Sequence, residues 1–227
     1  MTAIPLPEAL IFDMDGLLVD SEPASDVAME QFLAKRMLGF DPDLMERLLG
    51  RRLPEALAIV NDWFELGEEV TTITAEFADL RIAALRANLP VMAGAAEIVR
   101  WAKRVGMQVA LATSGMREHA DVSIAATGLT GEFHAEATGT EVERGKPEPD
   151  LFLLAASRLG VAAAACMVFE DSPAGIMAAK AAGMTAVWIP NAHSIDMPMP
   201  VAPNIKFDSL IDAQVWLAEL WQARRTS

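Results

Sequence analysis

Short apolar runs that alternate with helix-like segments are the feature of this sequence that most restricts its fold. The runs cover residues 9–12, 108–112, 166–169 and 186–189. The segments that read as helices lie near residues 95–105, 117–127, 149–159 and 174–182, and a closing helix is expected over 210–223. Short strands that alternate with helices form a parallel sheet with helices on both faces. The sequence therefore predicts an α/β fold.

The segment between the first apolar run and the others has a different pattern. From about residue 21 to residue 92 the spacing is helical, and Val27, Phe32 and Leu33 share one face of a helix. Asp41 followed by Pro42 is typical of a helix start. We therefore expect one α/β core, residues 1–20 and 93–227, interrupted by a helical insertion over residues 21–92.

The acidic character of the chain excludes several partners. Its formal net charge is −14, and no cluster of Lys or Arg offers a local exception, so nucleic acid and anionic lipid would be repelled. No apolar run reaches the roughly 18–20 residues of a membrane span. The N-terminal segment lacks the basic flank and apolar stretch of a signal peptide. We expect a cytoplasmic protein that binds neither nucleic acid nor membrane. Its oligomeric state is open, and a monomer is compatible with the sequence.

Polar side chains follow the apolar runs at the point where each predicted strand ends. In an open parallel sheet, ligands bind outside the carboxyl ends of the strands, so these positions are the candidate site. The side chains concerned are those of Asp13, Asp15, Thr113, Ser114, Lys146, Glu170 and Asp171. Carboxylates, hydroxyls and one lysine at a single edge are the groups that bind a metal ion and a phosphate.

The carboxylates divide into two pairs with different uses. Asp13 and Asp15 lie two residues apart, and they can do different jobs only if the strand ends between them, which Gly16 permits. One can attack a substrate and the other can carry protons. Asp171 and Glu170 would add oxygen ligands for Mg²⁺, which prefers a few carboxylates and keeps several waters.

The remaining polar side chains each have a simpler alternative use. Lys146 would neutralise the carboxylates and incoming phosphoryl oxygens, although a single lysine is commonly a surface charge. Thr113 would hydrogen-bond the phosphoryl group, although Thr after a strand commonly caps the next helix. His119, His134 and His193 lack metal-ligand spacing and are predicted to be structural or on the surface.

Four motifs, in order, resemble those of the haloacid dehalogenase-like superfamily. They are DMDGLLVDSEP at residues 13–23, TS at 113–114, KPEPD at 146–150 and EDSPAGI at 170–176. The resemblance spans nearly the whole chain. It implies a Rossmann-like parallel-sheet core with an inserted α-helical cap, and a reaction through a phosphoaspartyl intermediate.

The resemblance also implies roles for individual residues. Asp13 would be the nucleophile and Asp15 the general acid and base. Mg²⁺ would be held by Asp13, the main-chain carbonyl of Asp15 and Asp171, with Glu170 as an added or water-mediated ligand. Dehalogenases of the superfamily lack the second aspartate of the first motif. Its presence here favours phosphoryl transfer, and the expected reaction is hydrolysis of a small phosphorylated metabolite, a sugar or polyol phosphate.

The segment LGRRLPEAL, residues 49–57, bears on which substrate is used. In the resembling sugar-phosphate enzymes this loop carries an arginine that contacts substrate, and Arg52 is the preferred candidate here, with Ser114 as a second substrate contact. Arg51 and Arg52 can equally be solvated charges at a helix start. Related β-phosphoglucomutases place their arginine three residues after the glycine, where this chain has Leu53, and use a cap lysine, whereas no lysine occurs between Lys35 and Lys103. A phosphatase is therefore predicted ahead of a phosphomutase, and a non-catalytic binding protein of the same fold is the third reading.

Overall fold

The computed structural model describes residues 4–39, 41–48 and 53–225, and the chain divides into two compact units. One unit is Met1–Asp20 with Pro90–Ser227, and the other is Ser21–Leu89. The first unit contains strands β1 (Ala9–Phe12), β2 (Gln108–Thr113), β3 (Ala135–Thr138), β4 (Cys166–Glu170), β5 (Thr185–Trp188) and β6 (Ile205–Lys206). Its helices are α5 (Ala95–Arg104), α6 (Arg117–Thr127), α7 (Asp150–Leu159), α8 (Pro173–Ala181) and α9 (Leu210–Arg225), with 3-10 turns η1 (Gly139–Glu141) and η2 (Ala163–Ala165).

The strands of the first unit form one parallel sheet in the order β3-β2-β1-β4-β5-β6. The chain builds outward from β1 to one side through β2 and β3, and then returns to build the other side from β4. The order therefore reverses between β1 and β4, which is where open α/β sheets bind their ligands. Together with the helices this arrangement confirms the predicted α/β, Rossmann-like class.

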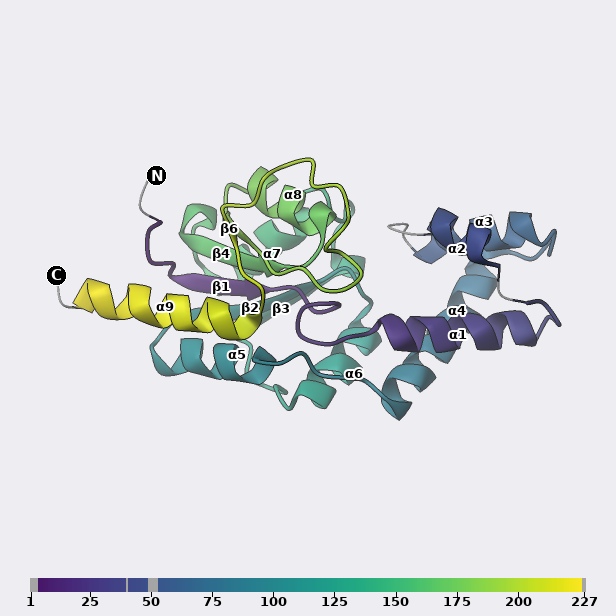
Figure 1. Cartoon of the computed structure of the whole chain (residues 1–227), viewed down its shortest axis with the longest axis horizontal. Helices are drawn as coiled ribbons and strands as arrows, with labels where there is room; N and C mark the ends of the chain where they lie inside the picture. The colour runs from purple at the N-terminus through teal and green to yellow at the C-terminus, as the bar shows by residue number, and fades with distance from the viewer. Residues whose placement is uncertain (1–3, 40, 49–52, 226–227) are drawn as a thin grey trace. The chain divides into compact units, whose positions relative to one another are not determined.

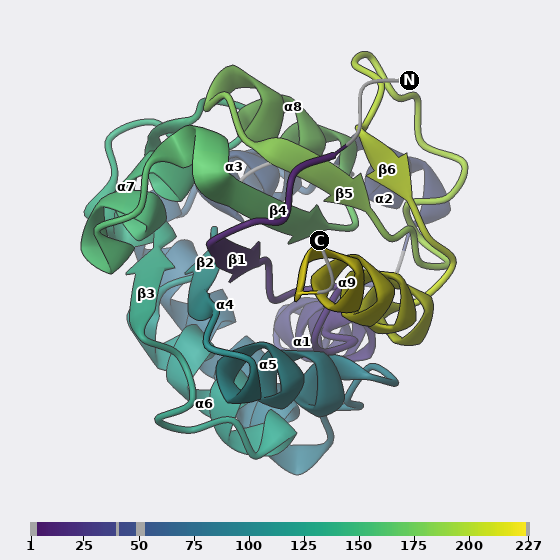
Figure 2. The same ribbon diagram turned by 90° about the vertical axis from the view of Figure 1, so that its left-hand side faces the viewer.

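Helices cover both faces of this sheet, as Figures 1 and 2 show from two directions. Helices α7 and α8 pack on one face, and α5 lies on the other beside α9. Because both faces of the sheet are covered, the strands carry apolar residues on both sides. Their sequences are therefore continuous hydrophobic runs instead of alternating ones. Phe12 and Phe169 pair in register and stack with ring centroids 5.1 Å apart. Each fully buried side chain of this kind stabilises the fold by about 1.5–3 kcal/mol.

The sequence pattern misses the two outermost strands of the sheet. Strand β3 has the sequence AEAT, which offers no run of large or β-branched apolar residues to mark it as a strand. Strand β6 has only two residues. Both lie at the edges of the sheet, where pairing to one neighbour, and not a local preference, determines the structure.

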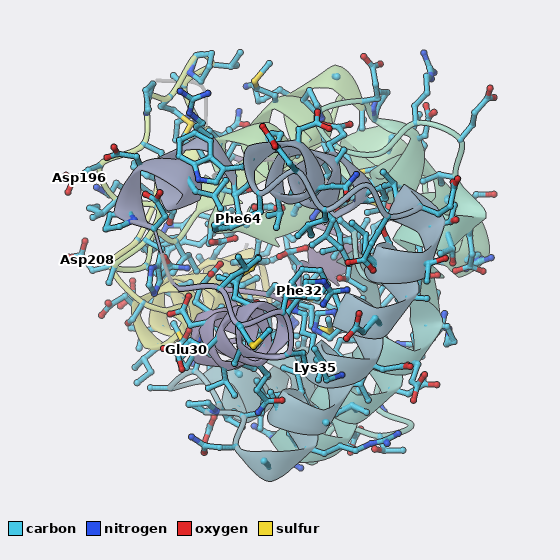
Figure 3. The ribbon with its side chains drawn as sticks, turned by 90° about the vertical axis from the view of Figure 1, so that its right-hand side faces the viewer. Glu30, Phe32, Lys35, Phe64, Asp196 and Asp208 are labelled. Carbon is cyan, nitrogen blue, oxygen red and sulfur yellow. The ribbon has the colours of Figure 1, made fainter. Side chains whose placement is uncertain are left out.

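The second unit is entirely helical where it is described. Its helices are α1 (Glu22–Ala34), α2 (Pro42–Leu48), α3 (Leu53–Trp63) and α4 (Val70–Ala87). Phe32 of α1, labelled in Figure 3, meets Phe77 of α4 edge to face with centroids 6.0 Å apart. Arg36 stacks over the ring of Phe32 and pairs with Glu68 and Glu76. A core of its own thus holds this unit together. No helix in the described ranges of either unit combines the length and hydropathy that a membrane span requires.

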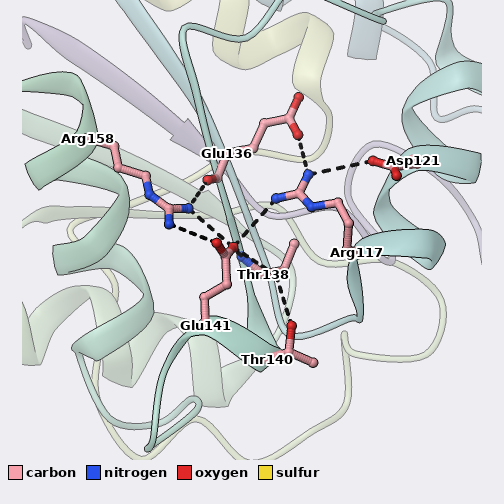
Figure 4. Close-up of polar contacts among 7 residues, drawn as sticks. All are labelled: Arg117, Asp121, Glu136, Thr138, Thr140, Glu141 and Arg158. Atoms are coloured by element: carbon pink, nitrogen blue, oxygen red, sulfur yellow. Dashed lines mark hydrogen bonds and ion pairs between the residues drawn. The ribbon is translucent and has the colours of Figure 1, made fainter.

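Glu141 is the centre of an ion-pair network that joins the end of β3 to α6 and α7 (Figure 4). Its carboxylate accepts hydrogen bonds from the main-chain N–H and the hydroxyl of Thr138, both at 2.8 Å. Arg158 of α7 donates to it at 2.8 Å, and Arg117 of α6 lies 3.5 Å away. The hydrogen bond from Arg158 is the largest reason that the pKa of Glu141 is lowered to about 2, and the Thr138 donors add to it.

This lowered pKa makes a prediction about stability and pH. Because the folded pKa lies below the ordinary one, ionised Glu141 stabilises the fold above about pH 4.5, and this contribution is lost as the pH falls toward 2. Its side chain is 32% exposed, so solvent screens the interaction. We expect Glu141→Gln to lower the free energy of unfolding by about 1 kcal/mol at pH 6, and by much less at pH 3. Urea unfolding at both pH values measures this, with the neighbouring exposed Glu143→Gln as a control that changes neither value. An equal loss at both pH values would contradict it.

Candidate active site

The carboxyl ends of β1 and β4 place the predicted carboxylates next to each other at the point where the strand order reverses. Asp13 directly follows β1, and its main-chain N–H donates to the carbonyl of Phe169 in β4 at 3.0 Å. Glu170 is the last residue of β4 and Asp171 follows it. Asp13, Glu170 and Asp171 are all buried. Parallel pairing alone therefore brings together residues that lie far apart in the sequence.

Lys146 reaches into this cluster and contacts two of the carboxylates. Its Nζ lies 2.5 Å from Oδ1 of Asp13 and 2.6 Å from Oε1 of Glu170, and only 7% of its side chain is exposed. It also lies over the ring of Phe152, 4.9 Å from the centroid. Burial alone would lower the pKa of Lys146, but the charges of Asp13 and Glu170 raise it above its ordinary value. The lysine is therefore a fixed positive charge between two buried carboxylates.

The start of α8 holds the second oxygen of Glu170. Oε2 accepts from the main-chain N–H of Ser172 at 2.7 Å and from its hydroxyl at 2.9 Å. The same hydroxyl caps α8 by accepting from the N–H of Gly175 at 3.1 Å. Gly175 is required here by space, because a Cβ on it would lie 1.8 Å from Oε1 of Glu170. The EDSPAGI motif thus fixes one carboxylate by a helix start packed directly against it.

A tight turn after β1 returns Asp15 to the same edge of the sheet. Gly16 adopts a positive φ of 78° in this turn, which favours glycine, and its N–H donates to the carbonyl of Val19 at 2.8 Å. The hydroxyl of Thr113, at the end of β2, donates to Oδ2 of Asp15 over 3.5 Å. Thr113 also accepts from the N–H of Gly115 at 3.0 Å, so its hydroxyl is already oriented.

Two residues of the site were not predicted for it from the sequence. Asn191, in the loop after β5, donates from Nδ2 to Oδ2 of Asp171 at 2.9 Å and to the carbonyl of Gly16 at 3.0 Å. It ties the turn after β1 to the carboxylate after β4. His119, predicted to be structural or on the surface, is buried with Nε2 3.1 Å from Oδ1 of Asp15. Neither residue belongs to a motif, and only the fold brings them here.

The structure describes only one of the two predicted substrate contacts. Ser114 is exposed in the turn after β2. Arg52, like Arg51, lies outside the described residues.

The cluster has the composition of a site for a hard divalent cation. Among the described residues, Asp13, Glu170 and Asp171 each offer a carboxylate oxygen, and these oxygens lie within 4.8 Å of one another. Three carboxylates face one ammonium group. Burial raises the pKa of Asp13 to about 7 against the opposing charge of Lys146, and burial likewise holds the pKa of Asp171 well above its usual range. The site needs more positive charge, and its oxygen donors suit Mg²⁺.

A parallel sheet with reversed strand order and an acidic cluster at the reversal is typical of α/β proteins that bind a small ligand at that edge. A family model described as haloacid dehalogenase-like hydrolase matches residues 7–183. The chain belongs to this family, which confirms the resemblance drawn from the four motifs and makes it an enzyme of the hydrolase class.

Individual relatives agree with this assignment. The chain is 31% identical to hexitol phosphatase B of Escherichia coli O157:H7 over 211 residues, which cover 90% of this chain and 93% of that protein. It is 28% identical to validoxylamine A 7'-phosphate phosphatase of Streptomyces hygroscopicus over 214 residues, covering 94% of both. The crystal structure of CbbY from Rhodobacter sphaeroides in complex with phosphate has the same fold, with a TM-score of 0.78, 24% identity and coverage of 90% of this chain and 95% of that one. Both sequence relatives are named phosphatases, which agrees with the predicted enzyme class, phosphoric monoester hydrolase.

The close packing of Gly175 makes a prediction about stability. Alanine is favoured over glycine inside a helix by about 1 kcal/mol, so a replacement in open space would stabilise α8. The added methyl group must instead displace Glu170, and overpacking of this kind costs about 1–3 kcal/mol. We therefore expect Gly175→Ala to unfold at lower urea concentration than the unaltered protein and to lose activity.

Gly39 provides the control for this substitution. A Cβ on Gly39 meets nothing within 4 Å, and its φ is not in the left-handed region. Gly39→Ala is expected to change the free energy of unfolding by less than about 0.5 kcal/mol. If Gly175→Ala were as stable and as active as Gly39→Ala, Glu170 would have room that the structure does not show.

Proposed function

We propose that this protein is a Mg²⁺-dependent phosphatase that hydrolyses a small phosphorylated sugar or polyol through a phosphoaspartyl intermediate. The observation that carries the proposal is the buried Asp13 carboxylate held at Oδ1 by Lys146, with Asp15 on the adjoining turn. A nucleophile and a proton carrier are then two residues apart, and both follow the end of β1.

Asp13 is the proposed nucleophile. Lys146 orients the Asp13 carboxylate through one oxygen. The main-chain N–H of Asp13 donates a hydrogen bond to the carbonyl of Phe169 in β4. A carboxylate oxygen of Asp13 attacks the phosphorus atom, and the bond between phosphorus and the substrate alcohol oxygen breaks. Lys146 lies where it offsets negative charge on the phosphoryl oxygens.

Asp15 is the proposed general acid and base. It gives a proton to the departing alcohol oxygen in the first step. In the second step it takes a proton from water, whose oxygen attacks the phosphorus atom and breaks the bond to Asp13. Inorganic phosphate is released and both carboxylates return to their starting state. Thr113 would hydrogen-bond the phosphoryl group during both steps.

The residues proposed to hold Mg²⁺ are Asp13, Asp171 and the main-chain carbonyl of Asp15, with Glu170 directly or through water. When bound, the ion supplies positive charge that favours ionised Asp13 and offsets the charge of the phosphoryl oxygens. Asn191 would orient Asp171 toward it, since it holds one oxygen of that carboxylate.

The substrate class follows from the relatives and from the proposed role of the helical unit. Both named sequence relatives are phosphatases, and one of them is named for hexitols. We propose that residues 21–92 act as a cap that excludes water and selects the substrate. Arg52, which lies outside the described residues, stays the preferred cap ligand, and Ser114 the preferred core ligand. The phosphomutase alternative is not favoured, and the ordered cluster argues against a non-catalytic binding protein.

The first test of this proposal replaces the nucleophile. With a panel of sugar and polyol phosphates, we expect phosphate to be released in step with the alcohol product and without any bisphosphate activator. Asp13→Asn should abolish this release while leaving the thermal unfolding temperature nearly unchanged, because the amide has the same shape but does not form the acyl phosphate. Glu8→Gln, at the opposite end of β1, is the matched control and should keep full activity.

Retention of more than about a tenth of the rate in Asp13→Asn would contradict the covalent role, since tenfold is only about 1.4 kcal/mol of barrier. Isomerised sugar phosphate in excess of released phosphate would instead point to a mutase.

The second test removes the metal. We expect chelation to stop turnover, Mg²⁺ to restore it, and Ca²⁺ to restore it poorly, because its larger and looser coordination misplaces the attacking oxygen. Binding should also raise the stability, by about 2.7 kcal/mol at a Mg²⁺ concentration of 100 times Kd. Thermal unfolding with and without Mg²⁺ measures this directly, and Asp171→Asn should weaken the shift. Full activity in excess chelator would remove the metal from the mechanism.

A further inference from the structure

His119 is a buried histidine whose position relates it to one residue of the proposed site. It is the third residue of α6, is 4% exposed and lies with Nε2 3.1 Å from Oδ1 of Asp15. The contact needs a hydrogen on Nε2, which the imidazolium and one of the two neutral tautomers carry. A histidine at this distance from a carboxylate can restrict how that carboxylate turns.

The contact is a close polar approach whose direction is not that of a linear hydrogen bond. Within the described part of the chain, Nε2 of His119 is buried and has no partner in hydrogen-bond geometry. Hydrogen bonds of this kind are commonly long or poorly aligned without substrate and tighten only when it is bound. A buried donor without an acceptor is unfavourable, which favours closer alignment of the two groups.

The two oxygens of Asp15 have different neighbours. Oδ1 faces the imidazole of His119, and Oδ2 accepts a hydrogen bond of 3.5 Å from the hydroxyl of Thr113. A carboxylate contacted on both oxygens has little freedom about its terminal torsion. His119 and Thr113 come from α6 and β2, so the orientation of Asp15 depends on two separate elements.

Gly115 leaves the space in which the imidazole lies. Its φ is not in the left-handed region, so the backbone does not require glycine there. A Cβ on Gly115 would, however, lie 2.9 Å from Nδ1 of His119, closer than real contacts allow. The glycine after Thr113 and Ser114 thus allows the ring to approach the end of β2.

The first residue of α6 anchors the helix that carries the histidine. Arg117 pairs with Glu136 of β3 at 2.5 Å and lies 3.5 Å from Glu141 (Figure 4). It also lies 3.6 Å from Asp121 on its own helix. The backbone next to His119 is therefore held to the sheet that carries Thr113.

We propose that His119 is a positioning residue that holds the Asp15 carboxylate in the orientation needed for proton transfer. The inference rests on the proposed role of Asp15 as general acid and base. His119 touches Asp15 and not the reacting atoms, so its effect passes through that carboxylate.

The proposal has a consequence that a purely structural histidine would not have. An alkyl phosphate needs a proton on its leaving oxygen, whereas p-nitrophenyl phosphate has a phenolate that leaves without one. The value of kcat/KM covers the steps up to release of the alcohol. Loss of positioning should therefore lower kcat/KM for a polyol phosphate and have little effect on kcat/KM for p-nitrophenyl phosphate.

The experiment compares two replacements of nearly equal size. His119→Met removes the donor, and His119→Gln keeps an N–H donor near the position of Nε2. We expect His119→Met to lower kcat/KM for the polyol phosphate about 10- to 100-fold, part of the 10²- to 10⁴-fold that acid and base catalysis contributes. For p-nitrophenyl phosphate we expect His119→Met to change kcat/KM by less than about threefold. His119→Gln should keep most of the unaltered protein's kcat/KM for the polyol phosphate. Ser123→Ala, on the same buried face of α6 one turn later, is the control. It should leave the ratio of kcat/KM for the polyol phosphate to kcat/KM for p-nitrophenyl phosphate unchanged.

A double-mutant cycle with Asp15→Asn tests the positioning role of His119 separately from the proposed acid and base role of Asp15. If His119 acts through Asp15, adding His119→Met to Asp15→Asn should cost no further activity toward the polyol phosphate. If Asp15→Asn itself leaves the polyol phosphate rate unaltered, the proposed role of Asp15 is wrong and the inference fails with it. If Asp15→Asn discriminates between the substrates but His119→Met slows both equally, or adds its full effect to Asp15→Asn, only the inference is overturned.

Gly115→Ala provides a second variant if His119→Met does not fold. It keeps every polar side chain and presses the added methyl group against the imidazole. We expect Gly115→Ala to lower kcat/KM for the polyol phosphate while leaving kcat/KM for p-nitrophenyl phosphate nearly unchanged. A folded Gly115→Ala protein with an unchanged ratio of the two kcat/KM values would overturn the proposal.

Discussion

The contact of Lys146 with Asp13 and Glu170 is the interaction on which the rest of the site depends. Three carboxylates buried at one edge of a sheet repel each other, and burial disfavours their charge. The ammonium group bridges two of them at 2.5 and 2.6 Å and is itself shielded from solvent. Such a buried charge cluster adds little stability compared with apolar residues of the same size, since desolvation offsets the attraction. Its arrangement is therefore better explained by chemistry than by folding.

The sheet topology explains why this cluster forms where it does. Strands β1 and β4 are neighbours only because the chain reverses its direction of growth between them, after building β2 and β3 on one side. Asp13 and Glu170 then lie at adjacent strand ends without any local sequence relation. The supports of Glu170 are nevertheless local, as its hydrogen bonds to Ser172 and the glycine space beside it show. Long-range pairing brings the groups together, and one short motif orients Glu170.

The α/β class could be predicted from the sequence because its strands are continuous apolar runs buried on both faces, which differ clearly from the helical periodicity around them. Strand β3 could not, because AEAT has no strand preference and its edge pairing with β2 is a tertiary effect. The same limit applies to the site. Asp13, Lys146, Glu170 and Asp171 stand in motifs and lie together, whereas Asn191 and His119 contact the site through the fold, and no spacing marks them. The roles of all these residues stay predictions.

Orientation is the property that these unmarked residues share. Asn191 holds one oxygen of Asp171 and the carbonyl of Gly16, and His119 lies against one oxygen of Asp15. A carboxylate that rotates freely presents its oxygens correctly for only part of the time, and misplacement by about 1 Å can cost about 100-fold in rate. Motif residues supply the charges, but the directions of the Asp15 and Asp171 carboxylates depend on neighbours from other elements. For that reason the chemistry of such a site can be predicted from the sequence, while the supports that orient it require the structure.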